Sequence, residues 1–190
     1  MQKQKKIVQD LIRHTTLNGR RPALAGFLGG DALHVERLLE TGRAEFPAQQ
    51  LKITFNFWLD LPKVEGVADT EKIDPNDLVP ALGYLALVDV EEDDDYRYAL
   101  FGSKIARVSG IDMTGKTLSN FVTTDDVKTF VWACYQVAGE LRQPLYTIHQ
   151  APPEITVSQW HRVILPLGRG GQITRFLVCS VPITEDGQVR

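Results

Sequence analysis

Hydrophobic residues near the start of the chain recur at helical spacing. Residues 2–16 carry an apolar stripe with lysine and glutamine opposite it, made of Ile7, Val8, Leu11 and Ile12. This pattern predicts an amphipathic helix that is too short to be stable alone. Similar spacing predicts a short helix from Asp31 to Gly42 and another from about Ala48 to Asp60. We therefore expect residues 1–50 to form a helical N-terminal extension.

From about residue 84 the pattern changes to short β-rich runs. Residues 84–90 and 96–101 flank a run of acidic residues, which is typical of a hairpin. With the turn centred on Asp93, one face of the hairpin would present Ala86, Val88 and Val90 together with Tyr96, Tyr98 and Leu100. The opposite face would carry Leu85, Leu87 and Phe101. Both faces are partly apolar, so we expect both to be covered.

The second half of the chain alternates in the same way between helical and β patterns. Residues 103–110 and 123–141 predict helices, and Thr123 or Thr124 would cap the longer one. Three β runs separated by short connections follow, at 145–150, 157–167 and 172–181. The order β-β-α-α-β-β-β predicts an α+β domain, which we place at residues 51–184.

Composition narrows the class of protein. The chain has 190 residues, 43% of them hydrophobic and 24% charged, which is typical of a globular domain. The net charge of −3 does not favour a nucleic-acid binder, because such domains are usually basic. Two cysteines are too few for a disulfide-stapled module. No apolar run approaches the roughly 20 residues of a membrane span, and the start lacks a signal peptide, so we expect a cytoplasmic protein.

Four motifs occur in order within the predicted domain. They are Asp74 to Leu78 (DPNDL), Asp89 to Glu91 (DVE), Tyr96 to Gly102 (YRYALFG) and Gly110 to Leu118 (GIDMTGKTL). In this order they resemble the PAS-like family of stand-alone alphaproteobacterial proteins, over roughly residues 51–183. The resemblance implies a PAS-like five-stranded antiparallel sheet with helices on one face, to which the chain adds its helical N-terminal extension.

The resemblance also implies a function. It indicates a non-enzymatic sensor or adaptor in bacterial signal transduction, which binds a small apolar ligand, a signalling protein, or both. A curved sheet closed by helices leaves an apolar cavity suited to such a ligand. The candidate ligand-binding residues are Val88, Tyr98, Leu100, Met113, Phe121, Phe130, His161 and Val163. The alternative is that such side chains fill a core, as in a purely structural interaction module. An enzyme or carrier would need converging polar groups.

The sequence predicts no cofactor. Cys134 is followed by Tyr135 and Gln136, and Cys179 by Ser180, so neither stands in the motif of flavin-binding photosensors. Residues 103–141 contain no histidine that could bind haem. Motifs for nucleophilic, phosphate-binding or zinc-protease chemistry are missing, so we predict neither catalytic residues nor an enzyme.

Two histidines, His149 and His161, lie on neighbouring predicted strands. If the turn between their strands centres near Ile155, His149 and His161 lie directly opposite each other. A further turn could bring Cys179 alongside His161. Zinc needs three or four ligands, so we predict no metal site, although adjacent imidazoles could respond to pH.

The basic amphipathic stripe at residues 2–16 has three interpretations. It could pack on the domain, pair with its copy in a dimer, or lie on an anionic membrane. Its short apolar face makes the membrane the least favoured. We expect a homodimer through this helix, and output by contact with an unidentified signalling protein.

Overall fold

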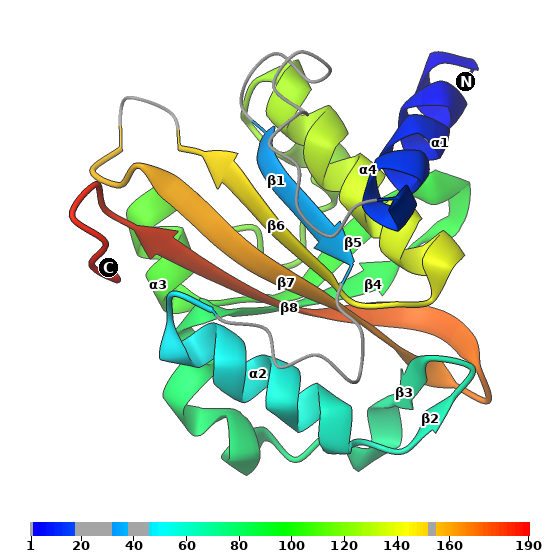
Figure 1. Cartoon of the computed structure of the whole chain (residues 1–190). Coiled ribbons are helices and arrows are strands. Elements are labelled where there is room, and N and C mark those ends of the chain that lie inside the picture. Colours follow the sequence, from blue (N-terminus) through cyan, green and yellow to red (C-terminus); the bar gives the residue numbers. More distant parts are fainter. Residues whose placement is uncertain (1, 18–31, 38–45, 152–154) are drawn as a thin grey trace.

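The fold is built on one mixed sheet. The computed structural model describes residues 2–17, 32–37, 46–151 and 155–190, which form an eight-stranded sheet (Figure 1). Its centre is antiparallel, in the order β6 (Leu145–Gln150), β7 (Gln159–Arg169), β8 (Gln172–Ile183), β4 (Leu85–Val90) and β5 (Tyr96–Phe101). β1 (Ala32–Arg37) pairs with β6. β3 (Val67–Asp69) pairs in parallel with β7 and antiparallel with β2 (Lys63–Val64). The five predicted strands are present, but the predicted count was too low.

Helices cover both faces of the sheet, so the prediction of helices on one face was wrong. α2 (Gln49–Asp60) and the 3₁₀ helix η2 (Pro75–Tyr84) pack on one face, and α1 (Gln2–Leu17) and α4 (Asp125–Leu141) lie over the other (Figure 1). The reason is visible in β7, where every residue from Trp160 to Gly168 is buried. A strand without polar alternation must be covered on both sides.

Local signals set the ends of the shorter elements. α3 (Ser103–Ser109) ends at Gly110, which has a left-handed conformation with φ of 73°. α4 begins where the Thr124 hydroxyl accepts a hydrogen bond from the Val127 amide. The remaining 3₁₀ turns are η1 (Thr70–Lys72), η3 (Glu92–Asp94) and η4 (Leu118–Asn120). The helices predicted at 48–60, 103–110 and 123–141 are therefore confirmed.

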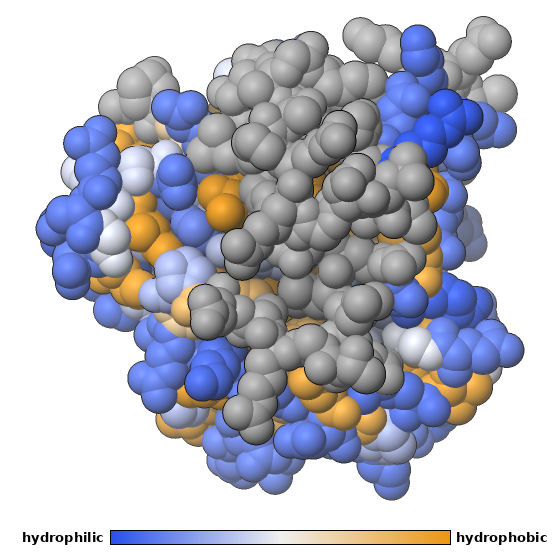
Figure 2. Space-filling view, viewed as in Figure 1, coloured by the Kyte–Doolittle hydropathy of each residue, from blue (hydrophilic) through white to orange (hydrophobic). Residues whose placement is uncertain are grey.

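The N-terminal segment shares the core of the domain. Ile7, Val8 and Leu11 of α1 are buried in the same cluster as the inner side of α4, while Lys5 and Lys6 are exposed. Figure 2 shows α1 presenting mainly hydrophilic residues outward. None of the helices in the described ranges has the length and hydrophobicity that crossing a membrane requires.

The helix predicted from Asp31 to Gly42 was wrong where the structure describes it. Residues 32–37 form strand β1, and the flanking residues lie outside the described part of the chain. Val35 is buried in β1, opposite Thr147 of β6. Strand β6 would otherwise be an open edge, and pairing with an open edge outweighs a weak helical preference.

The β4–β5 hairpin contains a register shift that the sequence pattern did not reveal. Val90 pairs with Tyr96 and Val88 with Tyr98, as predicted, but the next pair is Leu87 with Leu100. Ala99 is therefore the extra residue of a bulge, and every later side chain on β5 changes face. Leu100 turns outward and is 43% exposed, and Phe101 turns inward.

Candidate functional site

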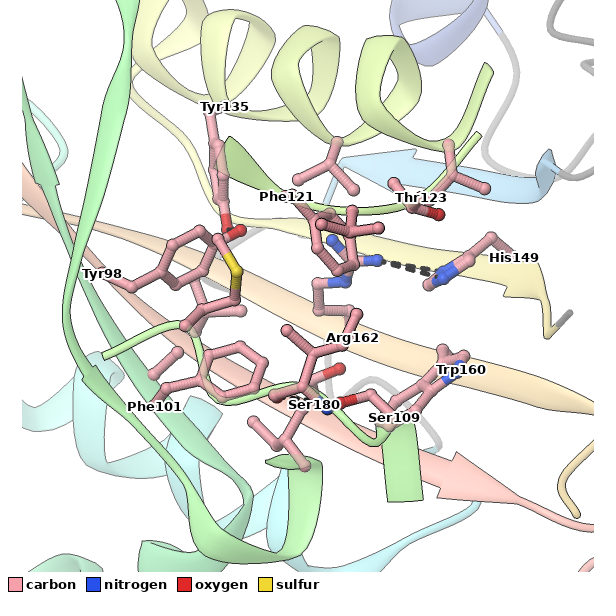
Figure 3. Close-up of a pocket in the computed structure, with 18 of the residues that line it drawn as sticks. Tyr98, Phe101, Ser109, Phe121, Thr123, Tyr135, His149, Trp160, Arg162 and Ser180 are labelled. Atoms are coloured by element: carbon pink, nitrogen blue, oxygen red, sulfur yellow. Dashed lines mark hydrogen bonds between the residues drawn. The ribbon is translucent and has the colours of Figure 1, made fainter. Parts of the chain in front are cut away.

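A cavity of about 260 Å³ lies between the sheet and α4 (Figure 3). Strands β4 to β8 form its floor, and Val127, Val131 and Tyr135 of α4 form its roof. The segment from Ile111 to Thr123 closes one side. Most of the wall is apolar, and its polar side chains are Tyr98, Ser109, Thr123, Tyr135, His149, Arg162 and Ser180. A largely apolar cavity with a few polar groups is the usual form of a small-molecule site.

The turn from Gly110 to Lys116 holds one wall of the cavity in place. The Asp112 carboxylate accepts hydrogen bonds from the Thr114 amide and hydroxyl, at 2.9 and 2.7 Å. The turn is then fixed to β5 through the Tyr98 backbone, whose amide donates to the Lys116 carbonyl. These bonds position Met113, which is 1% exposed, in the cavity wall.

Arg162 places a cation at the floor of this cavity. Its side chain projects from β7 toward α4, at the strand position between Thr147 of β6 and Ser180 of β8. The residue is only 6% exposed, and its Nη2 lies 3.0 Å from Nδ1 of His149 (Figure 3). Its buried Nε has no hydrogen-bond partner. No ion pair found among the described residues includes Arg162.

His149 is held neutral by this environment. Burial, the charge of Arg162 and the proximity of His161 together lower the pKa of His149 well below its ordinary value of 6.5. A neutral imidazole can accept the hydrogen bond from the Arg162 guanidinium, but it supplies no negative charge.

Two tyrosine hydroxyls add polarity elsewhere in the wall. The hydroxyls of Tyr98 and Tyr135 lie 3.2 Å apart, and both side chains are buried. Burial raises the pKa of both phenols, so both stay protonated and neutral. The Tyr135 ring also stacks on Phe176, which fixes its orientation.

The structure brings part of the predicted ligand-binding set together. Tyr98, Met113 and Phe121 line the cavity. Val88 and Phe130 are buried in the surrounding hydrophobic cluster but do not line the cavity. For these two residues, the core-filling interpretation describes their position better.

The other three predicted residues lie away from the cavity. Leu100 faces outward because of the bulge at Ala99. Val163 and His161 project from β7 to the opposite face of the sheet, where Val163 is buried in the same cluster as the α2 side chains. There His161 Nδ1 lies 2.6 Å from the Tyr146 hydroxyl.

The predicted pairing of His149 with His161 was wrong by one residue. Trp160 stands opposite His149, and His161 stands opposite Ile148. A shift of one residue moves a side chain to the other face of a sheet, so the two imidazoles lie on opposite faces. Cys179 pairs with Val163 and is not alongside His161. Within the described ranges, no three potential metal-binding side chains cluster.

Sequence reasoning missed Arg162 and Trp160 as cavity residues and did not place His149 in a cavity. A signal for Arg162 was present, because this arginine lies within the predicted β run of residues 157–167, directly before the apolar stretch 163–167. An arginine in a strand buried on both faces must point either into a polar site or toward a partner.

The element order, the central antiparallel sheet and the cavity beneath α4 define a class of α+β domains with a cavity between the sheet and a helix. Comparison with known families agrees, since a family model described as PAS domain matches residues 47–178. The chain therefore belongs to the PAS domain family, which confirms the family resemblance of its sequence motifs. The same comparisons found no match among curated proteins or solved structures.

Proposed function

We propose that this PAS domain is a non-enzymatic sensory or adaptor module that binds a small molecule in the cavity beneath α4. The observation that carries the proposal is the cavity itself, which a purely structural module with a filled core would not need. At about 260 Å³ it lies just below the usual ~300–1,000 Å³ of ligand pockets, so it suits a small ligand.

The packing of α1 suggests how occupancy would reach a partner. α4 forms the cavity roof, and its neighbour α1 contacts it with Ile7, Val8 and Leu11. A ligand with different affinities for two positions of α4 would shift the population toward the position that it binds more tightly, and the arrangement of α1 would change with it. The difference between the two affinities sets the size of the shift. A signalling protein that contacts α1 or α4 would read that shift.

The homodimer expected from the sequence remains a prediction. Within one chain, the apolar stripe of α1 already packs against α4. Dimerisation through this stripe would require α1 to leave α4, whereas dimerisation through the exposed lysines would not. Sedimentation of the full chain at several concentrations would test the prediction.

The ligand proposal can be tested with a substitution that fills the cavity. Val131→Phe adds an aromatic ring to the roof, and Val79→Phe makes the same change at a position on η2 that is 57% exposed. Native mass spectrometry and thermal-shift assays against a metabolite panel are run on the wild-type protein and on both variants. We expect wild type and Val79→Phe to bind the same compound, and Val131→Phe to lose it. Equal binding by all three, or binding by none, contradicts the proposal.

A further inference from the structure

We infer that the cavity ligand is a small monoanionic carboxylic acid with an apolar body, whose carboxylate pairs with the Arg162 guanidinium. This inference rests on the proposed ligand-binding function and adds the chemical class of the ligand. It is carried by a buried cation that lines the cavity and has no counter-ion among the described residues.

The ion pairs of the described chain lie elsewhere. They join Arg97 to Glu91, Arg142 to Glu65, Arg169 to Glu71 and Arg175 to Asp89, all with partly exposed side chains. Arg162 is more buried than any of these arginines, and its Nε is an unpartnered buried donor. A buried charge without a counter-ion is costly, so this site is built to favour an anion.

The neighbours of Arg162 cannot supply the missing negative charge. His149 is neutral, and Tyr98 and Tyr135 keep their protons because burial raises their pKa. Burial likewise raises the pKa of the Cys134 thiol to about 12. Thr147, at the strand position paired with Arg162, has a buried hydroxyl that also lacks a partner. Two unpartnered polar groups are therefore neighbours on the same face of the sheet.

The rest of the wall defines the body of the ligand. Phe101, Phe121 and Trp160 surround the space beside Arg162 (Figure 3), and Met113 also lines the cavity. These side chains suit an aromatic or branched aliphatic group. A guanidinium fork matches a carboxylate in two parallel hydrogen bonds. Arg162 is the only lysine or arginine in the described lining, so a single negative charge is favoured over a dicarboxylate or a phosphate.

The test compares an acid with its neutral counterpart. Phenylacetate, phenylacetamide and inorganic phosphate are titrated calorimetrically into wild type, Arg162→Met, Arg162→Lys and Arg169→Met. Arg169 is exposed on the surface, so its variant controls for loss of one positive charge. We expect wild type and Arg169→Met to bind phenylacetate more tightly than phenylacetamide. Arg162→Met should lose about 10- to 100-fold in phenylacetate affinity, the usual worth of a hydrogen bond to a charged group, and Arg162→Lys should lose less.

The outcomes separate this inference from the proposed function. If the wild-type protein binds phenylacetamide as well as phenylacetate, or Arg162→Met binds the acid normally, the anion assignment is wrong while the cavity is still a binding site. If phosphate binds more tightly than phenylacetate, the class of anion is wrong. If neither aromatic compound binds, the molecule that co-purifies with the native protein decides the assignment. A neutral molecule would overturn it, and a carboxylic acid would support it. If Arg162→Met fails to fold, the comparison of acid with amide on wild type and the result for Arg162→Lys still show whether Arg162 pairs with an anion.

Discussion

Mild acid should destabilise the ligand-free fold through His149. The folded protein holds the pKa of His149 well below 6.5, because of burial and the adjacent Arg162 charge. As the pH falls below about 6.5, the unfolded chain binds a proton at His149 while the folded protein does not. The stabilising contribution is therefore complete above the unfolded pKa and is lost as the pH falls toward the folded one.

The size of this effect follows from linkage. Each pH unit well below the unfolded pKa removes about 1.4 kcal/mol from the free energy of unfolding, as long as the folded histidine stays neutral. Between about pH 7.5 and about pH 5.5 the loss is on the order of 1 kcal/mol, because the upper part of that interval contributes little. Aspartate and glutamate side chains with ordinary pKa values stay ionised throughout the interval.

Urea denaturation across this pH interval gives the measurement, with His149→Gln as the matched variant. Glutamine keeps an acceptor for Arg162 but cannot titrate. We expect the difference in unfolding free energy between wild type and His149→Gln to change by roughly 1 kcal/mol across the interval, with wild type losing more in acid. The histidines other than His149 are present in both proteins, so in this difference they enter only through the coupling of His161 to His149. A difference that does not vary with pH would refute the reasoning, since His149 would then titrate alike in both states.

Three further predictions concern stability, each measured as the urea-denaturation free energy. Leu11→Ala in α1 should cost about 2–5 kcal/mol because Leu11 is fully buried. The control Gln9→Ala, on the exposed side of α1, should change stability by no more than about 0.5 kcal/mol. Equal effects of the two substitutions would mean that α1 does not share the core. Gly102→Ala should cost about 1–3 kcal/mol, because the added Cβ would lie 2.3 Å from the Gly83 carbonyl oxygen and 2.8 Å from that of Leu85. An unchanged stability would contradict this close packing. Gly139→Ala should stabilise α4 by about 0.5–1 kcal/mol because its Cβ meets nothing closer than 3.8 Å, and a loss of stability would contradict the open space there.

The elements of this fold could be predicted where local sequence and tertiary packing demand the same structure. α4 has an apolar stripe and a threonine cap, and its predicted helix is confirmed. β1 shows the opposite case, because the strand exists only where β6 offers an open edge. A short segment's pairing partner is not encoded in its own periodicity, so pattern alone favoured a helix there.

The site was harder to predict than the fold because side-chain direction in a sheet changes with every residue of register. Val88 and Tyr98 lie before the bulge and face the predicted way, and Leu100 lies after it and does not. A one-residue difference in the β6–β7 register likewise separates His149 from His161. Backbone irregularities of this kind depend on the packing of neighbouring strands, which no short sequence window contains.

The charge of Arg162 affects both the stability of the fold and its affinity for the proposed ligand. A guanidinium without a counter-ion in the sheet opposes folding by several kcal/mol. Arg162 nevertheless lies where β7 is buried from Trp160 to Gly168 and the neighbouring β8 is buried from Phe176 to Ile183. The burial of these strands holds the Arg162 side chain at the floor of the cavity. An anion that enters the cavity would therefore form the ion pair that Arg162 lacks in the ligand-free protein. The Arg162 side chain is already in position, so binding costs little conformational entropy there. If the inferred anion binds there, it would stabilise the domain more than a neutral occupant of similar shape.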